Sequence, residues 1–133
     1  MSDVTSLKDL VKNAKEHAKD IQKDGVKTHQ IRNFFAAVER MRRLYKNNPE
    51  DEQILMELIL LQPKLAYTAG RQPNSVGKSF FKHFSTIIDQ VLKVSDRGNQ
   101  AETREQLKGF FAYTESIVAY HKYFEKVKTE NHG

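Results

Sequence analysis

Residues 54–61 of this chain read Ile54-Leu55-Met56-Glu57-Leu58-Ile59-Leu60-Leu61, with one charged side chain in the whole run. A helix over this stretch would be apolar on almost every side, and such a helix normally lies at the centre of a bundle. Pro49 suits the first position of that helix, and acids follow it in the first turn, where they favour the helix dipole. We expect Pro63 to kink the helix, because proline removes a backbone donor, and Gly70 to end it.

The rest of the chain has the same helical character. Its 133 residues contain only six glycines and three prolines, strand-like alternation is missing, and apolar residues recur three and four positions apart. Thr28 is expected to cap the second helix through its hydroxyl, and Gly25 to end the first. The other helices are predicted at residues 5–24, 28–47, 75–94 and 100–126. The predicted fold class is therefore all-α, a compact bundle of about five helices with the third kinked at Pro63.

Length and composition limit the class of protein. A chain of 133 residues can bury one core, so we expect residues 1–133 to form a single helical domain, with 128–133 as a frayed tail. Without cysteine, neither a disulfide nor a thiolate metal site can form. No stretch reaches the roughly 20 apolar residues that span a bilayer, and the polar N-terminus does not resemble a signal peptide. We expect a cytoplasmic protein with no membrane partner.

The formal net charge of +5 is distributed unevenly. Residues 28–48 contain five basic side chains and one acidic one, a net charge of +4, and residues 71–93 contain four and one, a net charge of +3. Between them, residues 49–70 carry a net charge of −3. A basic surface is therefore expected locally, on the second and fourth predicted helices, and such a surface suits a polyanionic partner.

The basic residues of these two helices fall on defined faces when projected at about 100° per residue. On the second helix they flank the apolar stripe or point outward, with one acid, Glu39, nearby: Arg32, Arg40, Arg43 and Lys46. On the fourth helix they lie opposite the apolar face: Lys78, Lys82 and Lys93. Each set is either a contact surface for nucleic acid or an ordinary solvated face, and the missing counter-charges keep both interpretations open.

Three other features also have two interpretations. Arg42 projects into the apolar stripe of the second helix, so its guanidinium must be paired or must reach solvent through its long stem. It either pairs with an acid of the third helix or belongs to an interface with a partner. Tyr113 and Tyr120 of the last helix could stack on bases, although packing is the commoner use of such residues. A row of lysines follows the first helix, where nearby acids weaken its field: Lys8, Lys12, Lys15, Lys19 and Lys23.

Patterns that would indicate catalysis are few. None of the five histidines forms an HxxxH or HExxH pair, so neither a metal nor another cofactor is expected. Residues 77–79 are similar to the end of a phosphate-binding loop, but the spacing from Gly70 and the preceding helix do not fit. His121 lies on the apolar face of the last helix, where a hydrogen-bonded core histidine is the common case. A small nuclease that uses His121 and Lys122 is the less favoured alternative.

Three stretches go beyond composition: THQIRNFF at residues 28–35, LLQPKLAYTAGR at 60–71, and FFAY at 110–113 followed by IVAYHKY at 117–123. In this order, and with the last element near the C-terminus, they resemble the small subunit of the type III-A CRISPR effector (Csm) complex. The resemblance covers about residues 28–125, and the second stretch is the most specific. Residues 1–27 match only as a variable, basic N-terminal helix.

The resemblance implies a non-catalytic helical subunit that stacks in several copies and lines the channel holding guide RNA and target RNA in antiviral defence. Other subunits of the complex and copies of the chain itself are the implied protein partners. A channel that accepts any guide contacts phosphate and ribose rather than base edges. The motifs carry over Arg32, Lys64, Arg71 and Lys122 as RNA contacts, and the charge pattern adds Arg40, Arg43, Lys46, Lys78 and Lys82. The alternative is a helical scaffold subunit without direct RNA contact.

Overall fold

The computed structural model describes residues 3–70 and 77–132, with side chains described over 7–70 and 77–127. These residues form five α-helices and one short 3-10 turn, without a strand among them, so the all-α prediction is confirmed. The elements are α1 (Asp3–Lys23), η1 (Thr28–Gln30), α2 (Arg32–Asn47), α3 (Glu52–Gly70), α4 (Lys78–Asp96) and α5 (Gln100–His132). The last helix thus extends beyond the predicted end at residue 126.

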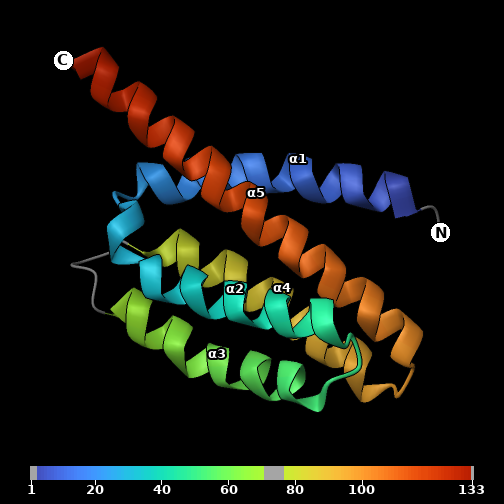
Figure 1. The fold of residues 1–133 in the computed structure, drawn as a ribbon. Helices are drawn as coiled ribbons and strands as arrows, with labels where there is room; N and C mark the ends of the chain where they lie inside the picture. Colours follow the sequence, from blue (N-terminus) through green and yellow to red (C-terminus); the bar gives the residue numbers. More distant parts are fainter. Residues whose placement is uncertain (1–2, 71–76, 133) are drawn as a thin grey trace.

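The helices are arranged so that α1 and α3 lie at opposite edges of the bundle (Figure 1). α1 packs against α5 and α4, whereas α3 packs against α2 and α4. α2 also contacts α5, and the two lie on the face that is turned toward the viewer in Figure 1. The long helix α5 crosses this face obliquely, and its C-terminal part extends past α1.

Aromatic rings fill the centre between α2 and α4. The ring of Phe34 lies 5.1 Å from that of Phe80 and 4.9 Å from that of Phe84, both edge to face, a favourable geometry for aromatic pairs. All three side chains are buried, and the core continues from them into α1, α3 and α5 through Ala14, Leu58 and Phe110 among others. Five helices therefore share one core, as the apolar stripes of the sequence predicted.

The position of α3 differs from the prediction that this apolar helix lies at the centre of the bundle. One side of α3 is buried, through Ile54, Leu58, Leu61 and Leu65, but the other side faces outward at the edge of the bundle. The apolar residues on that outward side are therefore exposed: Met56, Ile59, Leu60 and Tyr67, at 52–67% of their surface. A helix that is apolar all round needs neighbours all round, and within the described residues α3 has them on one side.

The two ends and the proline of α3 also differ in detail from the prediction. The helix begins at Glu52 rather than at Pro49, because Asn48 and Asp51 form two successive turns first: their side-chain oxygens accept hydrogen bonds from the amides of Glu50 and Gln53 at 3.1 and 2.9 Å. α3 continues as one helix through Pro63 to Gly70, and the predicted kink is not confirmed.

Thr28 does not cap α2, contrary to the prediction. The helix begins at Arg32, after the η1 turn, and no side chain caps it. The hydroxyl of Thr28 instead lies 3.1 Å from His121 Nδ1 and 3.3 Å from Glu125 Oε1 on α5. A long-range contact has thus replaced the local one. The predicted stop at Gly25 is confirmed, since α1 ends at Lys23 and Gly25 adopts the left-handed conformation with φ 87°.

Candidate nucleic-acid interface

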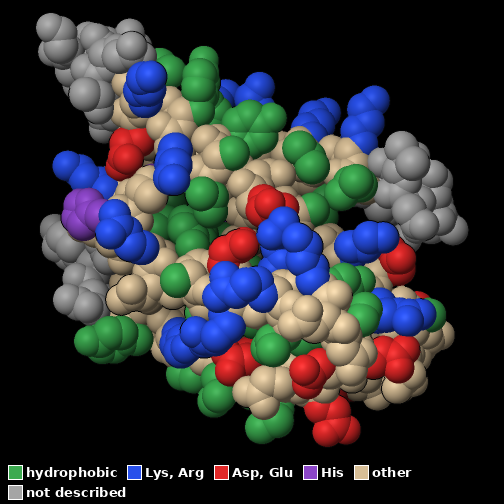
Figure 2. Space-filling model, viewed as in Figure 1, with side chains coloured by type: hydrophobic (Ala, Val, Ile, Leu, Met, Phe, Trp, Pro, Cys, Tyr) green, Lys and Arg blue, Asp and Glu red, His purple; other side chains and the backbone are tan. Residues whose placement is uncertain are grey.

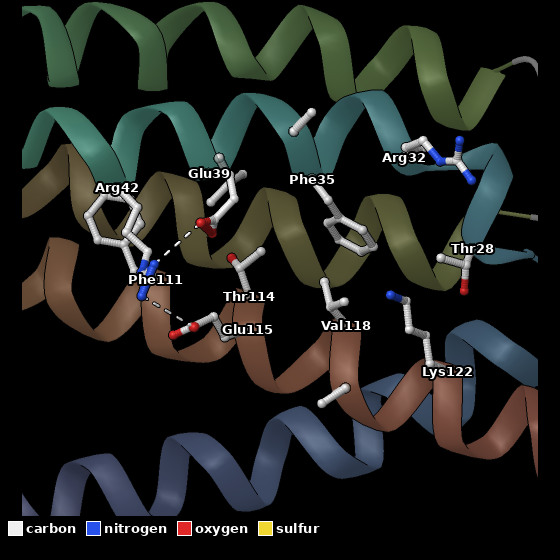
Figure 3. Close-up of a pocket in the computed structure, with 13 residues that line it drawn as sticks. Thr28, Arg32, Phe35, Glu39, Arg42, Phe111, Thr114, Glu115, Val118 and Lys122 are labelled. Atoms are coloured by element: carbon white, nitrogen blue, oxygen red, sulfur yellow. Dashed lines mark hydrogen bonds and ion pairs between the residues drawn. The ribbon is translucent and has the colours of Figure 1, made fainter.

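A groove with a volume of about 640 Å³ lies between α2 and α5 (Figure 3). Its floor is apolar, with Phe35 and Val38 contributed by α2 and Phe111 and Val118 by α5. Its rim is polar and charged, and carries the side chains Thr28, Arg32, Glu39, Arg42, Glu115 and Lys122, whereas Thr114 is buried at the floor. α2 and α5 pack together at this face, so the groove depends on their mutual placement and has no signature in either helix alone.

Arg32 and Lys122 lie at the same end of the groove, beside Thr28 (Figure 3). The sequence predicted each as an RNA contact from a different motif, and only the fold brings them together. Both side chains are exposed, and neither forms a salt bridge with a carboxylate in the described part of the chain. Two cations without a carboxylate partner at the mouth of one groove have the chemistry that suits an anion.

The outward flank of α2 extends this positive charge along the groove. Arg43 and Lys46 are eleven and fourteen residues after Arg32, which places them on nearly the same side of the helix at 100° per residue. Both are exposed. Figure 2 shows Lys and Arg side chains gathered across this face, over α2 and α5. Three of the four predicted cations of α2 are therefore available beside the groove.

Arg40 is the exception on α2, because α3 supplies the counter-charge that the prediction found missing. Its guanidinium donates a hydrogen bond to Glu57 Oε1 at 2.8 Å. This bond, followed by one from Gln53, lowers the pKa of Glu57 below its usual value. Arg40 thus points toward α3, and its charge is compensated within the protein.

Arg42 also has a partner, although not the predicted one. Its guanidinium lies 3.3 Å from Glu39 Oε1 on the same helix and 3.6 Å from Glu115 Oε1 on α5. The prediction that Arg42 pairs with an acid of the third helix is therefore wrong. The apolar flank of α2 that carries Arg42 faces α5 rather than α3 (Figure 3). The three charges connect the two helices at the end of the groove opposite Arg32.

Lys64 lies on α3, on the side that faces α2. It is seven residues after Glu57, so the two share a helix face, and Glu57 contacts Arg40 of α2. Because α2 and α3 are joined by a short turn and run antiparallel, Lys64 lies toward the N-terminal end of α2, where Arg32 is (Figure 1). Lys64 is exposed. The other contact predicted from this motif, Arg71, lies outside the described residues.

Lys78 and Lys82 lie on the other side of the molecule. Phe80 and Phe84 of α4 contact Phe34 of α2, so the opposite face of α4, which carries the two lysines, points away from α2 and from the groove. Both lysines are exposed. A single strand bound in the groove would not reach them, and the nine predicted contacts therefore do not form one continuous surface.

His121 and Tyr113 of α5 are buried and hydrogen-bonded within the bundle. His121 is fully buried, and its ring nitrogens contact the Val26 carbonyl oxygen at 2.6 Å and the Thr28 hydroxyl at 3.1 Å. It is the hydrogen-bonded core histidine that the sequence favoured, and its ring is closed to a substrate. Tyr113 is buried, with its hydroxyl 2.7 Å from His17 Nδ1, and burial raises its pKa.

Within the described residues, no three or more His, Asp or Glu side chains come together in a way that could hold a metal ion. None of the helices there is long and apolar enough to cross a membrane.

The sequence did not identify Glu115 or the two threonines that line the groove, Thr28 and Thr114, as part of a site. Glu115 had one detectable signal, since it is an acid on the flank of an otherwise apolar stripe. The threonines had none, because a helix pattern does not show which neighbour a hydroxyl will face.

Fold and groove together define a small all-α protein with a groove between two helices that is edged by cations. The chain matches the family model described as Csm2 Type III-A over residues 4–127, and it therefore belongs to that family. This family is the small subunit of a type III-A CRISPR complex, so the protein associates with the other subunits of that complex. Searches of curated proteins and of solved structures found no match.

Proposed function

We propose that this subunit binds the backbone of guide RNA and target RNA, without sequence preference and without catalysis, in several stacked copies within the effector complex in the cytoplasm. The observation that carries the proposal is the meeting of Arg32 and Lys122 at one end of the α2–α5 groove. Each belongs to a stretch that resembles the family, and neither is neutralised by a carboxylate in the described part of the chain.

The chemistry of the site favours phosphate over base edges. Guanidinium and ammonium groups bind phosphate oxygens by charge-assisted hydrogen bonds, and such contacts position a strand without reading its sequence. Arg43, Lys46 and Lys64 are exposed cations that lie on α2 or on the side of α3 facing it, and they extend the positive surface available to a strand. Arg40 and Arg42 contribute less, because Glu57, Glu39 and Glu115 compensate their charge.

The buried ring of His121 supports a non-catalytic role, since the alternative of a small nuclease would need that ring at the surface. Removing His121 as a test of cleavage would also disturb the fold. A direct test is therefore the purified chain with radiolabelled RNA, in the presence and absence of divalent cations. Cleavage that purifies with the wild-type chain and disappears in the Lys122→Ala variant would contradict this part of the proposal.

The RNA proposal is tested by the double variant Arg32→Ala/Lys122→Ala in the assembled complex. Target-RNA affinity should fall equally for two unrelated target sequences with matching guides. The slope of log affinity against log salt should become shallower by about 1.4, since each contact to single-stranded phosphate contributes about 0.7. Lys64→Ala/Arg71→Ala is the corresponding test of the second motif, with a loss of affinity as the expected result.

The matched control is Lys82→Ala/Lys93→Ala, which removes the same charge from the outer face of α4. We expect it to change affinity and salt slope much less than the groove variant. Equal losses for both variants would indicate a general electrostatic effect and overturn the assignment to the groove. No loss for the groove variant would favour the second candidate function, a scaffold without RNA contact, which the exposed apolar side of α3 supports.

A further inference from the structure

One ring in the α2–α5 groove is held in place by the core and still faces the groove. Phe35 on α2 is half-buried. The centre of its ring lies 6.0, 6.4 and 6.2 Å from those of Phe34, Phe80 and Phe84, so the core fixes one side of the ring. The rest of it points into the groove toward α5 (Figure 3). Phe35 is one helical turn after Arg32, and it therefore offers a fixed aromatic surface next to the cationic end of the groove.

The two ends of the groove differ in charge. Arg32 and Lys122 lie at one end, without a carboxylate partner in the described part of the chain. At the other end the guanidinium of Arg42 lies 3.3 Å from a carboxylate oxygen of Glu39 and 3.6 Å from one of Glu115. Two carboxylates around one guanidinium leave that end with a net negative charge. A phosphate is therefore attracted to the first end and repelled by the second, so an RNA backbone would not follow the groove along its whole length.

The other polar side chains of the groove already have partners within the chain. The hydroxyl of Thr114 donates a hydrogen bond to the Phe110 carbonyl oxygen at 2.9 Å, and that of Thr28 lies 3.1 and 3.3 Å from two groups of α5. The two carboxylates at the far end contact Arg42. What the groove offers beside its two cations is apolar and aromatic surface. Such a surface stacks on the face of any base and does not read base edges.

We propose that the groove takes up one unpaired nucleobase of the bound RNA, stacked on Phe35, while Arg32 and Lys122 hold the phosphate of that nucleotide. The volume of about 640 Å³ lies within the roughly 300–1,000 Å³ typical of small-molecule sites. The base must be unpaired, because a paired base is already stacked between its neighbours in the duplex. This inference rests on the proposed function and deepens it: the subunit contacts a base face as well as phosphate, and still has no sequence preference.

The mouth of the groove can be narrowed without changing its charge. Ala36 on α2 and Ala119 on α5 are exposed residues of the lining. Ala36→Leu/Ala119→Leu adds apolar volume on both sides of the mouth, whereas the matched control Ala36→Ser/Ala119→Ser leaves it open. The free leucine variant should bind single-stranded RNA about tenfold more weakly than wild type, within the range for one stacked base. The salt slope should not change, because both cations remain, and neither should the affinity for fully paired duplex RNA.

A photoreactive base locates the contact in the assembled complex. The target RNA carries a single 4-thiouridine at a position that does not pair with the guide, and this position is varied along the strand. After irradiation and digestion, mass spectrometry should find cross-links at Phe35 in the wild type and in the serine control, and far fewer in the leucine variant. Cross-links confined to residues outside the groove lining would overturn the proposal. The wild-type result decides this point even if the leucine variant does not fold.

The outcomes separate this inference from the proposed function. Weaker RNA binding by Arg32→Ala/Lys122→Ala, together with wild-type binding by a folded leucine variant, would overturn base insertion and leave the backbone contacts in place. No loss for either variant would overturn both. A leucine variant that binds single-stranded RNA like the wild type but fails to enter the complex would show that another subunit occupies the groove, and would also overturn base insertion.

Discussion

His121 provides the sharpest test of how this bundle is held together. Its buried ring ties α5 to the connection between α1 and α2, with Nε2 2.6 Å from the carbonyl oxygen of Val26 and Nδ1 3.1 Å from the hydroxyl of Thr28. Since a carbonyl oxygen can only accept, Nε2 carries the proton and donates that hydrogen bond. Replacement by alanine removes both contacts and leaves the polar groups of Val26 and Thr28 to be satisfied in another way.

The expected loss can be estimated from these contacts. A buried acceptor that loses its donor costs about 1–3 kcal/mol, and the space left by a ring replaced with a methyl group costs about 2 kcal/mol more by comparison with other large-to-small core changes. We therefore expect His121→Ala to lower the free energy of unfolding by about 3–5 kcal/mol. That is a large part of the roughly 5–15 kcal/mol typical of a domain.

Urea denaturation followed by far-UV circular dichroism measures this loss, with the m-value checked for two-state behaviour. Lys122→Ala is the control: its side chain is the exposed neighbour of His121, and we expect a change within about 0.5 kcal/mol. His121→Gln keeps a side-chain donor and should lose less than His121→Ala. A loss below about 1 kcal/mol for His121→Ala, or an equal loss for Lys122→Ala, would refute the structural role assigned to the ring.

Three further predictions concern stability. Pro63→Ala should raise the free energy of unfolding by about 1–3 kcal/mol, since α3 is continuous there and the new amide can donate to the Ile59 carbonyl; a lower melting temperature would contradict this. Burial, and then the neighbouring ring of His83, lower the pKa of His17 below 6.5, so the unfolded state binds the proton more readily. Stability should therefore be steady above about pH 6.5 and fall as the pH drops through that value, and His17→Gln should weaken this dependence in urea titrations across that range; an unchanged pH profile would exclude His17 as its source. Gly98→Ala should cost about 1 kcal/mol, because Gly98 has φ 79°, which alanine adopts only with strain; unchanged thermal unfolding would refute that.

The secondary structure was largely predictable because helical periodicity is local. The buried side of α2, including Phe34, Val38 and Met41, follows from spacing alone, and so does the stop at Gly25. Helix starts were less predictable. Thr28 has the right chemistry for a cap, but its hydroxyl contacts His121 and Glu125 on α5, and no pattern near residue 28 shows that these groups are within reach.

The sequence predicted which cations could take part in the candidate site. It did not predict which of them lie together or which are paired with acids. Charge counting singled out Arg32, Arg40 and Arg43 on equal terms, yet Glu57 of α3 neutralises Arg40. It also grouped Lys78 and Lys82 with the others, although α4 presents them on the opposite side of the bundle. Compensation and grouping depend on which helices become neighbours, and that is decided by packing between distant parts of the chain.

The sequence by itself determined the all-α class, the buried side of most helices and, through three short stretches, the resemblance to the family that residues 4–127 match. These properties depend on residues a few positions apart or on motifs that are continuous in the chain. Tertiary structure alone decided that α3 lies at an edge with its apolar side open, and that Arg32 and Lys122 meet at one groove. The physical reason is that a helix pattern specifies which side needs covering, whereas long-range packing decides which sides the chain covers and which remain open to a partner.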